Sequence, residues 1–145
     1  PGCIDTQTHF REPGSTDTED LYSGSRAAIV GGITSVFEMP NTNPPTSTKI
    51  EFQKKLDLAK NRMYCNYAFY FGATADNASE LADLVNLEGC CGIKLFAGSS
   101  TGNLLVAEEE DIEKVFQSSS KVVAVHSEDE AILNINKNQF LILVR

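Results

Sequence analysis

Short apolar runs recur along this chain at nearly even intervals, and this spacing restricts the fold more than any other feature. The runs are Cys3–Ile4, Ile33–Phe37, Cys65–Phe71, Cys91–Phe96 and Val122–Val125. They begin 26 to 32 residues apart, which is the length of one strand, a crossover helix and the return to the next strand. The spacing therefore predicts five strands of a parallel sheet, because strictly alternating strands and helices build sheets of that kind.

The segments between these runs carry the signals of helices. Thr16 with Glu19, and Thr48 with Glu51, have the spacing of capping boxes at the start of helices. Three sets of apolar residues have helical spacing and predict buried helix faces: Phe52, Leu56, Ala59 and Met63; Leu81, Leu84 and Val85; and Ile112, Val115 and Phe116. At least four helices are therefore expected between the five strands.

The composition narrows the range of partners and compartments. Twelve Lys and Arg residues against twenty Asp and Glu residues give a net charge of -8, which argues against binding to nucleic acid or to an anionic membrane. No apolar run approaches the roughly 18 residues of a membrane span. The four cysteines, Cys3, Cys65, Cys90 and Cys91, form no Cys-x-x-Cys motif, so we expect reduced, mostly buried thiols in a cytoplasmic protein.

Two architectures fit this pattern, namely an open doubly wound sheet and part of a β/α barrel. Both place functional side chains at the carboxyl ends of strands. The polar residues in such places are His9, Asn41, Lys94 and His126, with Arg11 two residues after the first histidine. A closed eight-stranded barrel needs about 250 residues, and this chain has 145.

Each of these residues also has an ordinary structural explanation. A lone His9 or His126 is more often a hydrogen-bonded structural residue, Arg11 a surface cation, and Asn41 a turn residue. Lys94 lies in an apolar run, where an unpaired ammonium is costly to bury, unless the side chain reaches solvent at the strand end. Imidazoles suit zinc, whereas a lysine could ligate metal only when neutral or converted by carbon dioxide to a carbamate.

Two glycine patterns bear on whether the chain has a nucleotide site. No Gly-x-Gly-x-x-Gly follows the first expected strand, so a dinucleotide fold is not supported. The segment Gly98–Gly102 lacks the Gly-Lys-Ser/Thr ending of a phosphate loop, and is interpreted as a strand–helix connection.

Four motifs resemble the barrel of the dihydroorotases, which belong to the amidohydrolase superfamily of metal-dependent hydrolases. The motifs are Pro1–Gly14, Met39–Pro45, Gly92–Phe96 with Gly98–Gly102, and Val125–Asp129. They occur in order, at expected strand ends, and together cover the whole chain. The resemblance implies an α/β fold that is an incomplete TIM (β/α)8 barrel, with about the first five β/α units and a parallel sheet over residues 1–145.

The resemblance also implies an activity and a site. Dihydroorotases hydrolyse a cyclic amide, interconverting dihydroorotate and carbamoyl aspartate in pyrimidine synthesis, with one or two metal ions, usually zinc, that activate water. His9, Lys94 and His126 match metal ligands of the family, with Lys94 as the carboxylated lysine that bridges two metals. Arg11 and Asn41 match the residues that hold the substrate carboxylate, and they favour dihydroorotase over an allantoinase or hydantoinase type of cyclic amidohydrolase.

The chain departs from the family pattern in several places. Gln7, a neutral amide, stands where the first histidine of the metal-binding His-x-His motif belongs. A further metal histidine on strand six, the general-base aspartate on strand eight and the small β-domain before the barrel have no counterpart here, so no catalytic residue is assigned. Residues 134–145 match no family motif and are interpreted as an atypical C-terminal tail within the domain.

Three functions are left open. The first is a truncated dihydroorotase-type hydrolase that we expect to be inactive by itself. The second is a non-catalytic, dihydroorotase-like scaffold or partner of aspartate transcarbamoylase. The third is a plain five-stranded α/β binding module without metal. Because the first and last strands would be unpaired edges, we also expect self-association or marginal stability.

Overall fold

One parallel sheet of five strands forms the centre of the molecule, and its strands lie side by side in sequence order. A computed structural model describes residues 1–98, 100 and 103–143. The strands are β1 (Cys3–Thr8), β2 (Ile33–Glu38), β3 (Asn66–Gly72), β4 (Cys90–Phe96) and β5 (Val123–His126). Five parallel strands were predicted from the spacing of the apolar runs, and this prediction is confirmed.

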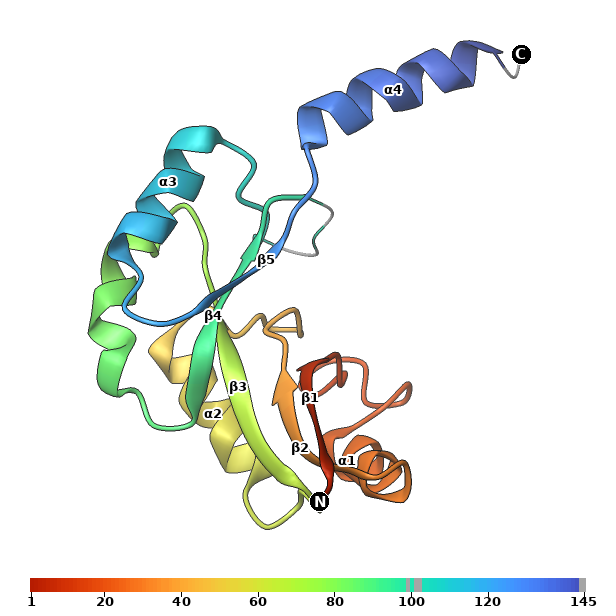
Figure 1. Ribbon diagram of the computed structural model, residues 1–145, viewed down its shortest axis with the longest axis vertical. Helices are drawn as coiled ribbons and strands as arrows, with labels where there is room; N and C mark the ends of the chain where they lie inside the picture. The colour runs from red at the N-terminus through yellow and green to blue at the C-terminus, as the bar shows by residue number, and fades with distance from the viewer. Residues whose placement is uncertain (99, 101–102, 144–145) are drawn as a thin grey trace.

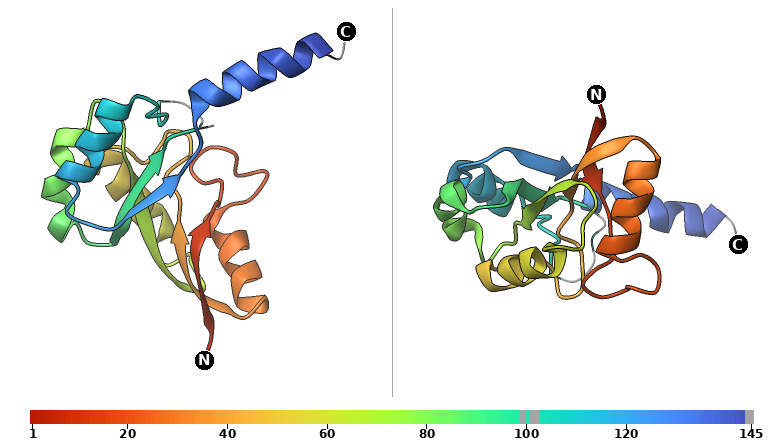
Figure 2. Two further views of the ribbon diagram at one scale, coloured as in Figure 1. Left: turned by 45° about the horizontal axis from the view of Figure 1, so that its top comes forward. Right: turned by 90° about the horizontal axis from the view of Figure 1, so that it is seen from below.

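The strand order decides between the two architectures that the sequence left open. In a doubly wound sheet, the order in which strands are added reverses at a switch point. Here each new strand is added next to the previous one, always in the same direction across the sheet. With right-handed crossovers, this order puts all the helices on one face and lets the sheet curl. Figures 1 and 2 show the curled sheet with helices outside it. The fold is therefore an incomplete β/α barrel, as the resemblance implies.

Five helical segments follow the strands. They are α1 (Leu21–Val30), α2 (Lys49–Ala59), the 3-10 segment η1 (Ala78–Asn86), α3 (Glu109–Ser118) and α4 (Glu130–Leu143). The first four cover the outer face of the sheet, whereas α4 projects away from the rest of the molecule (Figure 1). No helix in the described part of the chain is long and apolar enough to cross a bilayer.

The helix starts were predicted correctly at one position and wrongly at another. The hydroxyl of Thr48 accepts a hydrogen bond from the backbone N–H of Glu51 at 3.1 Å, so it caps α2 at the expected position. The other half of the predicted capping box does not form, because the Glu51 carboxylate binds Lys54. The expected start at Thr16 is wrong. Residues 16–18 form a turn, and α1 begins at Leu21, where Asp20 Oδ1 accepts from the backbone N–H of Ser23 at 2.6 Å.

The hydrophobic core lies between the outer face of the sheet and the helices. Its members include Val36, Phe52, Phe69, Phe71, Leu81, Leu84, Ile93 and Val115, all fully buried. The predicted helix faces are partly wrong, because Val85 is 53% exposed and Phe116 is 51% exposed. For Val85 the reason is that residues 78–86 form a 3-10 segment with three residues per turn. This repeat buries Ala78, Leu81 and Leu84, and Val85, the next residue, faces away from the core.

The four cysteines are free thiols, as expected. Cys65 and Cys90 are buried and Cys91 is half-buried, but Cys3 is exposed. The expectation of mostly buried thiols therefore fails at Cys3, which lies on the edge strand β1. The edges β1 and β5 leave the prediction of self-association open to test.

The strand register divides the side chains of the sheet between two faces. Lys94 pairs with Gly72 on β3 and with Ala124 on β5, so these three residues share a face. The neighbouring residue Ile93 belongs to the core under the helices, so Lys94 projects from the opposite, inner face. His126 pairs with Phe96, two residues beyond Lys94, and lies on the same inner face.

Candidate functional site

The first strand ends in a histidine that is paired with an asparagine from the second. His9 Nδ1 and Asn41 Oδ1 are 2.8 Å apart, and both residues are half-buried. The two strand ends are joined by a hydrogen bond from the backbone N–H of Met39 to the carbonyl of Thr8 at 2.9 Å. A carbonyl oxygen can only accept, so His9 carries a proton on Nδ1 and the lone pair lies on Nε2.

The surroundings of His9 favour its neutral form. Burial lowers the pKa of His9 from its ordinary value of 6.5, and the hydrogen bond that His9 donates to Asn41 opposes that shift. The positive charges of Arg11, Lys94 and Lys55 lower this pKa further. Neutral imidazole is the form that binds metals, so the environment keeps His9 in its ligating state.

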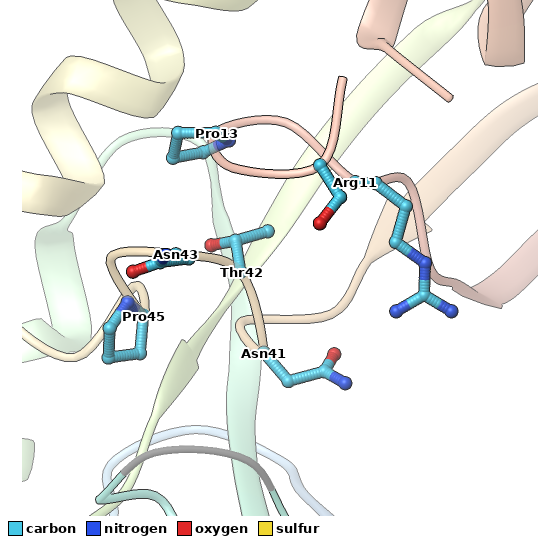
Figure 3. Close-up of a pocket in the computed structure, with 7 residues that line it drawn as sticks. Arg11, Pro13, Asn41, Thr42, Asn43 and Pro45 are labelled. Carbon is cyan, nitrogen blue, oxygen red and sulfur yellow. The ribbon is translucent and has the colours of Figure 1, made fainter. Parts of the chain in front are cut away.

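Beside this pair lies a cavity of about 340 Å³ that carries a positive side chain. Its lining residues are Arg11, Pro13, Ser15, Asn41, Thr42, Asn43 and Pro45. In Figure 3 the side chains of Arg11 and Asn41 leave their two loops toward the same side of the view. Arg11 is exposed, and no carboxylate of the described residues forms an ion pair with it. The cavity therefore suits an anion, because a guanidinium binds planar carboxylates through two parallel N–H groups.

The loop that presents Arg11 is anchored by the next residue, Glu12. The guanidinium of Arg62 donates to both oxygens of Glu12, at 2.7 and 3.0 Å. Glu12 also accepts from the backbone N–H of Leu21 at 3.0 Å, and it is buried. Sequence reasoning missed this anchor, since its two charges are 50 residues apart. It fixes the exit of the loop and thereby the place of Arg11.

Lys94 is a buried lysine on the inner face. Its residue is only 2% exposed, so the alternative of a strand-end lysine that reaches solvent is wrong. Burial lowers its pKa, and its Nζ lies 5.0 Å from the centre of the Phe96 ring. Within the described residues no carboxylate forms an ion pair with it. A buried ammonium with so little compensation is costly, which favours the neutral amine.

His126 lies at the end of β5 in a more open place. Its Nε2 lies 2.8 Å from Glu128 Oε2, and its ring stacks on Phe96 with a centroid distance of 6.2 Å. Its side chain is 38% exposed. This contact supports the ordinary structural explanation of His126, as a histidine paired with Glu128.

Gln7 is exposed, and its backbone N–H donates to Asp5 Oδ1 at 3.0 Å. The structure thus brings His9, Arg11 and Asn41 together, with Lys94 near enough to affect the pKa of His9. His126 shares the inner face at the other edge of the sheet. The segment Gly98–Gly102 lies partly outside the described residues, at 99, 101 and 102.

The donors on the inner face can be compared with what a metal requires. In residues 1–98, 100 and 103–143, no group of three or more His, Cys, Asp or Glu side chains could hold a metal ion. The predicted ligands include the imidazole of His9, which follows β1, and that of His126 at the end of β5, and an ammonium is no ligand. These donors fit a metal only if Lys94 is carboxylated, because the carbamate would add anionic oxygens to the imidazoles.

Sequence reasoning also missed a buried ion pair and a buried amide behind the site. Glu38 and Lys55 meet between β2 and α2, and both are fully buried. Asn77 donates from Nδ2 to the carbonyls of Ser47 and Gly72, at 3.0 and 2.9 Å. Glu38 had a signal, since it ends an apolar run just as Lys94 interrupts one, whereas nothing in the sequence marked Asn77.

A curled parallel sheet with its polar side chains at the carboxyl edge defines part of a β/α-barrel protein, a class whose functional sites lie at that edge. Comparison with known proteins agrees. Residues 1–134 match the profile of the "Amidohydrolase family". The chain belongs to the amidohydrolase family.

The chain is similar to several known proteins over most of its length. The "Dihydroorotase" of Methanosarcina mazei is 38% identical over 133 residues, which are 90% of this chain and 29% of the relative. "Multifunctional protein CAD" of Squalus acanthias is 39% identical over 104 residues, which are 72% of this chain and 4% of that protein. The solved L-hydantoinase from Arthrobacter aurescens superposes with a TM-score of 0.85 at 29% identity, over 96% of this chain and 32% of that chain. The chain thus spans less than a third of the length of these relatives.

Proposed function

We propose that this chain carries the substrate-carboxylate and lysine-bearing part of a dihydroorotase-type cyclic amidohydrolase, which interconverts dihydroorotate and carbamoyl aspartate in pyrimidine synthesis. Relatives named dihydroorotase at 34 to 38% identity support the class. The observation that carries the proposal is the cavity in which Arg11 and Asn41 lie together, with Asn41 bonded to His9.

The chemistry of these three side chains supports a carboxylate ligand. With Asn41 Oδ1 engaged by His9, the two N–H groups of the Asn41 amide are left as donors. The Arg11 guanidinium adds two parallel donors and a full positive charge. The substrate carboxylate would be held by Arg11 and Asn41, and the reacting amide would then lie on the side of His9.

A metal would be held by His9 and His126, with Lys94 as a carbamate. His9 Nε2 has its lone pair, because the proton lies on Nδ1. The lowered pKa of Lys94 raises the fraction of neutral amine, whose nitrogen attacks carbon dioxide and releases one proton. The amidohydrolase family generally uses a metal, and zinc, one ion or two, supplies a polarised carbonyl and an activated water when bound.

The same cavity supports a choice among the cyclic amides. Arg11 and Asn41 are the residues by which the sequence resembles dihydroorotases rather than hydantoinases or allantoinases. A substrate with a carboxylate beside its cyclic amide would use both of them. We therefore place dihydroorotate before a hydantoin or allantoin as the substrate.

A second candidate is a non-catalytic, dihydroorotase-like partner of aspartate transcarbamoylase. Gln7 favours it, because an amide is a weaker metal ligand than the imidazole that the family has at this position. In this case the chain would act by contact with the transcarbamoylase.

One experiment separates the two candidates. Zinc is titrated into the 145-residue chain with bicarbonate present, bound metal is counted, and dihydroorotate hydrolysis and co-elution with aspartate transcarbamoylase are then measured. One tightly bound zinc per chain that is lost in Lys94→Ala and His126→Ala, without co-elution, supports the hydrolase. Unchanged metal content in these variants would refute the ligand assignment. We expect no turnover by these residues alone, because no residue matches the family's general base, and robust zinc-dependent turnover would refute that expectation.

A further inference from the structure

A buried ion pair lies directly behind the loop that carries Asn41. Glu38 is the last residue of β2 and faces α2, where its Oε2 contacts the ammonium of Lys55. The exposed fractions of the two side chains are 0% for Glu38 and 1% for Lys55. The ammonium also lies 5.2 Å from the centre of the Phe69 ring. Two charges are thus held in an otherwise apolar layer between sheet and helix.

Stability alone does not explain this pair. Glu38 Oε1 has no hydrogen-bond partner among the described residues, so the desolvation of the carboxylate is only partly compensated. Burial raises the pKa of Glu38 to about 7 and lowers that of Lys55. Apolar residues of similar volume are often as stable as such a pair. Its presence here therefore calls for a role beyond holding α2 on the sheet.

The contacts of Lys55 point to that role. Its Nζ donates to the carbonyl of Met39 at 3.1 Å and to the hydroxyl of Thr46 at 3.4 Å. Met39 and Thr46 bracket residues 40–45, the part of the β2–α2 loop that carries Asn41. The backbone N–H of Thr46 donates to the carbonyl of Pro40 at 2.9 Å, and the carbonyl of Thr46 accepts from Gly72 at 2.8 Å. One buried ammonium thus ties together both ends of the loop where it crosses the edge of the sheet.

We infer that Lys55 is a positioning residue that fixes loop 39–46 so that Asn41 meets His9. The placement follows from the contacts alone, whereas its value for catalysis rests on the proposed function. Lys55 touches neither the cavity nor His9. It acts through the Met39 carbonyl, which belongs to the peptide bond to Pro40 and lies two residues before Asn41.

The test uses the two histidines, since the chain has only His9 and His126. Imidazole nitrogen spectra are recorded at pH 8 for the wild type, Glu38→Gln and the double variant Glu38→Gln/Lys55→Met. The double variant removes both buried charges and the donor, while Glu38→Gln keeps the Lys55 donor. We expect the double variant to lose the His9 signature of a single tautomer protonated on Nδ1, with His126 unchanged, and Glu38→Gln to keep that signature. An unchanged His9 signature in a folded double variant would overturn the inference.

A milder variant keeps the inference testable if the double variant does not fold. Thr46→Val removes the hydroxyl that accepts from Lys55 and leaves the charges in place. We expect a smaller change of the His9 signature in the same direction, and an unchanged signature would again count against the role of Lys55. Dihydroorotate is not used in either measurement. A failure to bind it, with the changes at His9 present, would refute the proposed function and leave the positioning role intact.

Discussion

The two histidines mark two regions of the carboxyl edge that are built very differently. At the β1–β2 end, His9 is half-buried, bonded to an amide and backed by the Glu12–Arg62 and Glu38–Lys55 pairs. At the β5 end, His126 is 38% exposed and has a carboxylate as its partner. The helix that follows it is exposed at every residue from 131 to 140. The contrast teaches that one region is preorganised, while the other is open.

The charges of the two regions differ as well. The cavity at the β1–β2 end has Arg11 as its charged residue. A larger cavity of about 940 Å³ at the β5 end is lined by acidic residues, among them Glu108, Glu109 and Glu128, together with the apolar Ile112 and Phe116. An anionic substrate is therefore expected at the first region and not at the second.

The largest effect that would break the first region is the loss of one partner of its buried ion pair. Lys55→Met leaves the carboxyl of Glu38 buried without its cation, and we expect a loss of about 3–5 kcal/mol in the free energy of unfolding. The matched control is Lys114→Met on α3, whose exposed pair with Asp111 should contribute less than about 0.5 kcal/mol. Urea denaturation measures both. Equal losses of unfolding free energy in Lys55→Met and Lys114→Met would show that the buried pair contributes no more than the exposed one.

The pH dependence of stability tests the same pair. Because burial raises the pKa of Glu38 from 4.5 to about 7, the folded protein binds this proton more tightly than the unfolded chain does. The resulting stabilisation is complete below pH 4.5 and is lost as the pH rises through 7. The stability of the wild type relative to Glu38→Gln should therefore fall by on the order of 3 kcal/mol between pH 4.5 and 7.5. A difference that grows with pH would show that the carboxylate is stabilised instead.

The Glu12–Arg62 anchor should have a smaller effect. Glu12→Ala removes two hydrogen bonds from Arg62 and one from the backbone of Leu21. Hydrogen bonds to charged groups contribute about 1.5–3 kcal/mol, and since Arg62 is partly exposed we expect a total loss of about 2 kcal/mol. Chemical denaturation gives the value, with Glu51→Ala in the first turn of α2, where Glu51 pairs with Lys54, as the control. A loss no larger than in the control would contradict the anchoring role.

The smallest effect concerns the charge near His9. Because the guanidinium of Arg11 lowers the pKa of His9, Arg11→Met should raise that pKa toward 6.5. Asn41→Ala should lower it, since the hydrogen bond to Asn41 raises it. Proton NMR titration measures both, with His126 as the internal reference in the same spectra. A shift of His126 equal to that of His9 would mean that the effect is not local.

Much of the fold could be predicted from the sequence, because the apolar runs repeat at the length of one β/α unit. The start of α1 could not. Thr16 and Glu19 have the spacing of a cap, but Glu12 is held by an arginine 50 residues away and its carboxylate binds the backbone of Leu21 instead. The 3-10 form of residues 78–86 likewise had no local signal.

The candidate site was predictable where a polar residue ends or interrupts an apolar strand. His9, Asn41 and Lys94 were found in this way, and so could Glu38 have been. The pairing of Glu38 with Lys55, and the reach of Lys55 to both ends of the loop, depend on how α2 packs on β2. Such contacts are set by tertiary packing, and residue spacing does not encode them.

The central claim is that Arg11 and Asn41 hold the carboxylate of a cyclic amide next to His9. Its most direct test is a titration of isotope-labelled protein with dihydroorotate, followed by the side-chain N–H signals of Arg11 and Asn41 and the ring signals of His9. We expect these three residues to shift together in the wild type and in Arg26→Met, an exposed control on α1. In Arg11→Met, the signals of Asn41 and His9 should stay unchanged. Equal shifts in both variants, or shifts confined to the acidic cavity around Phe116 and Glu128, would contradict the account.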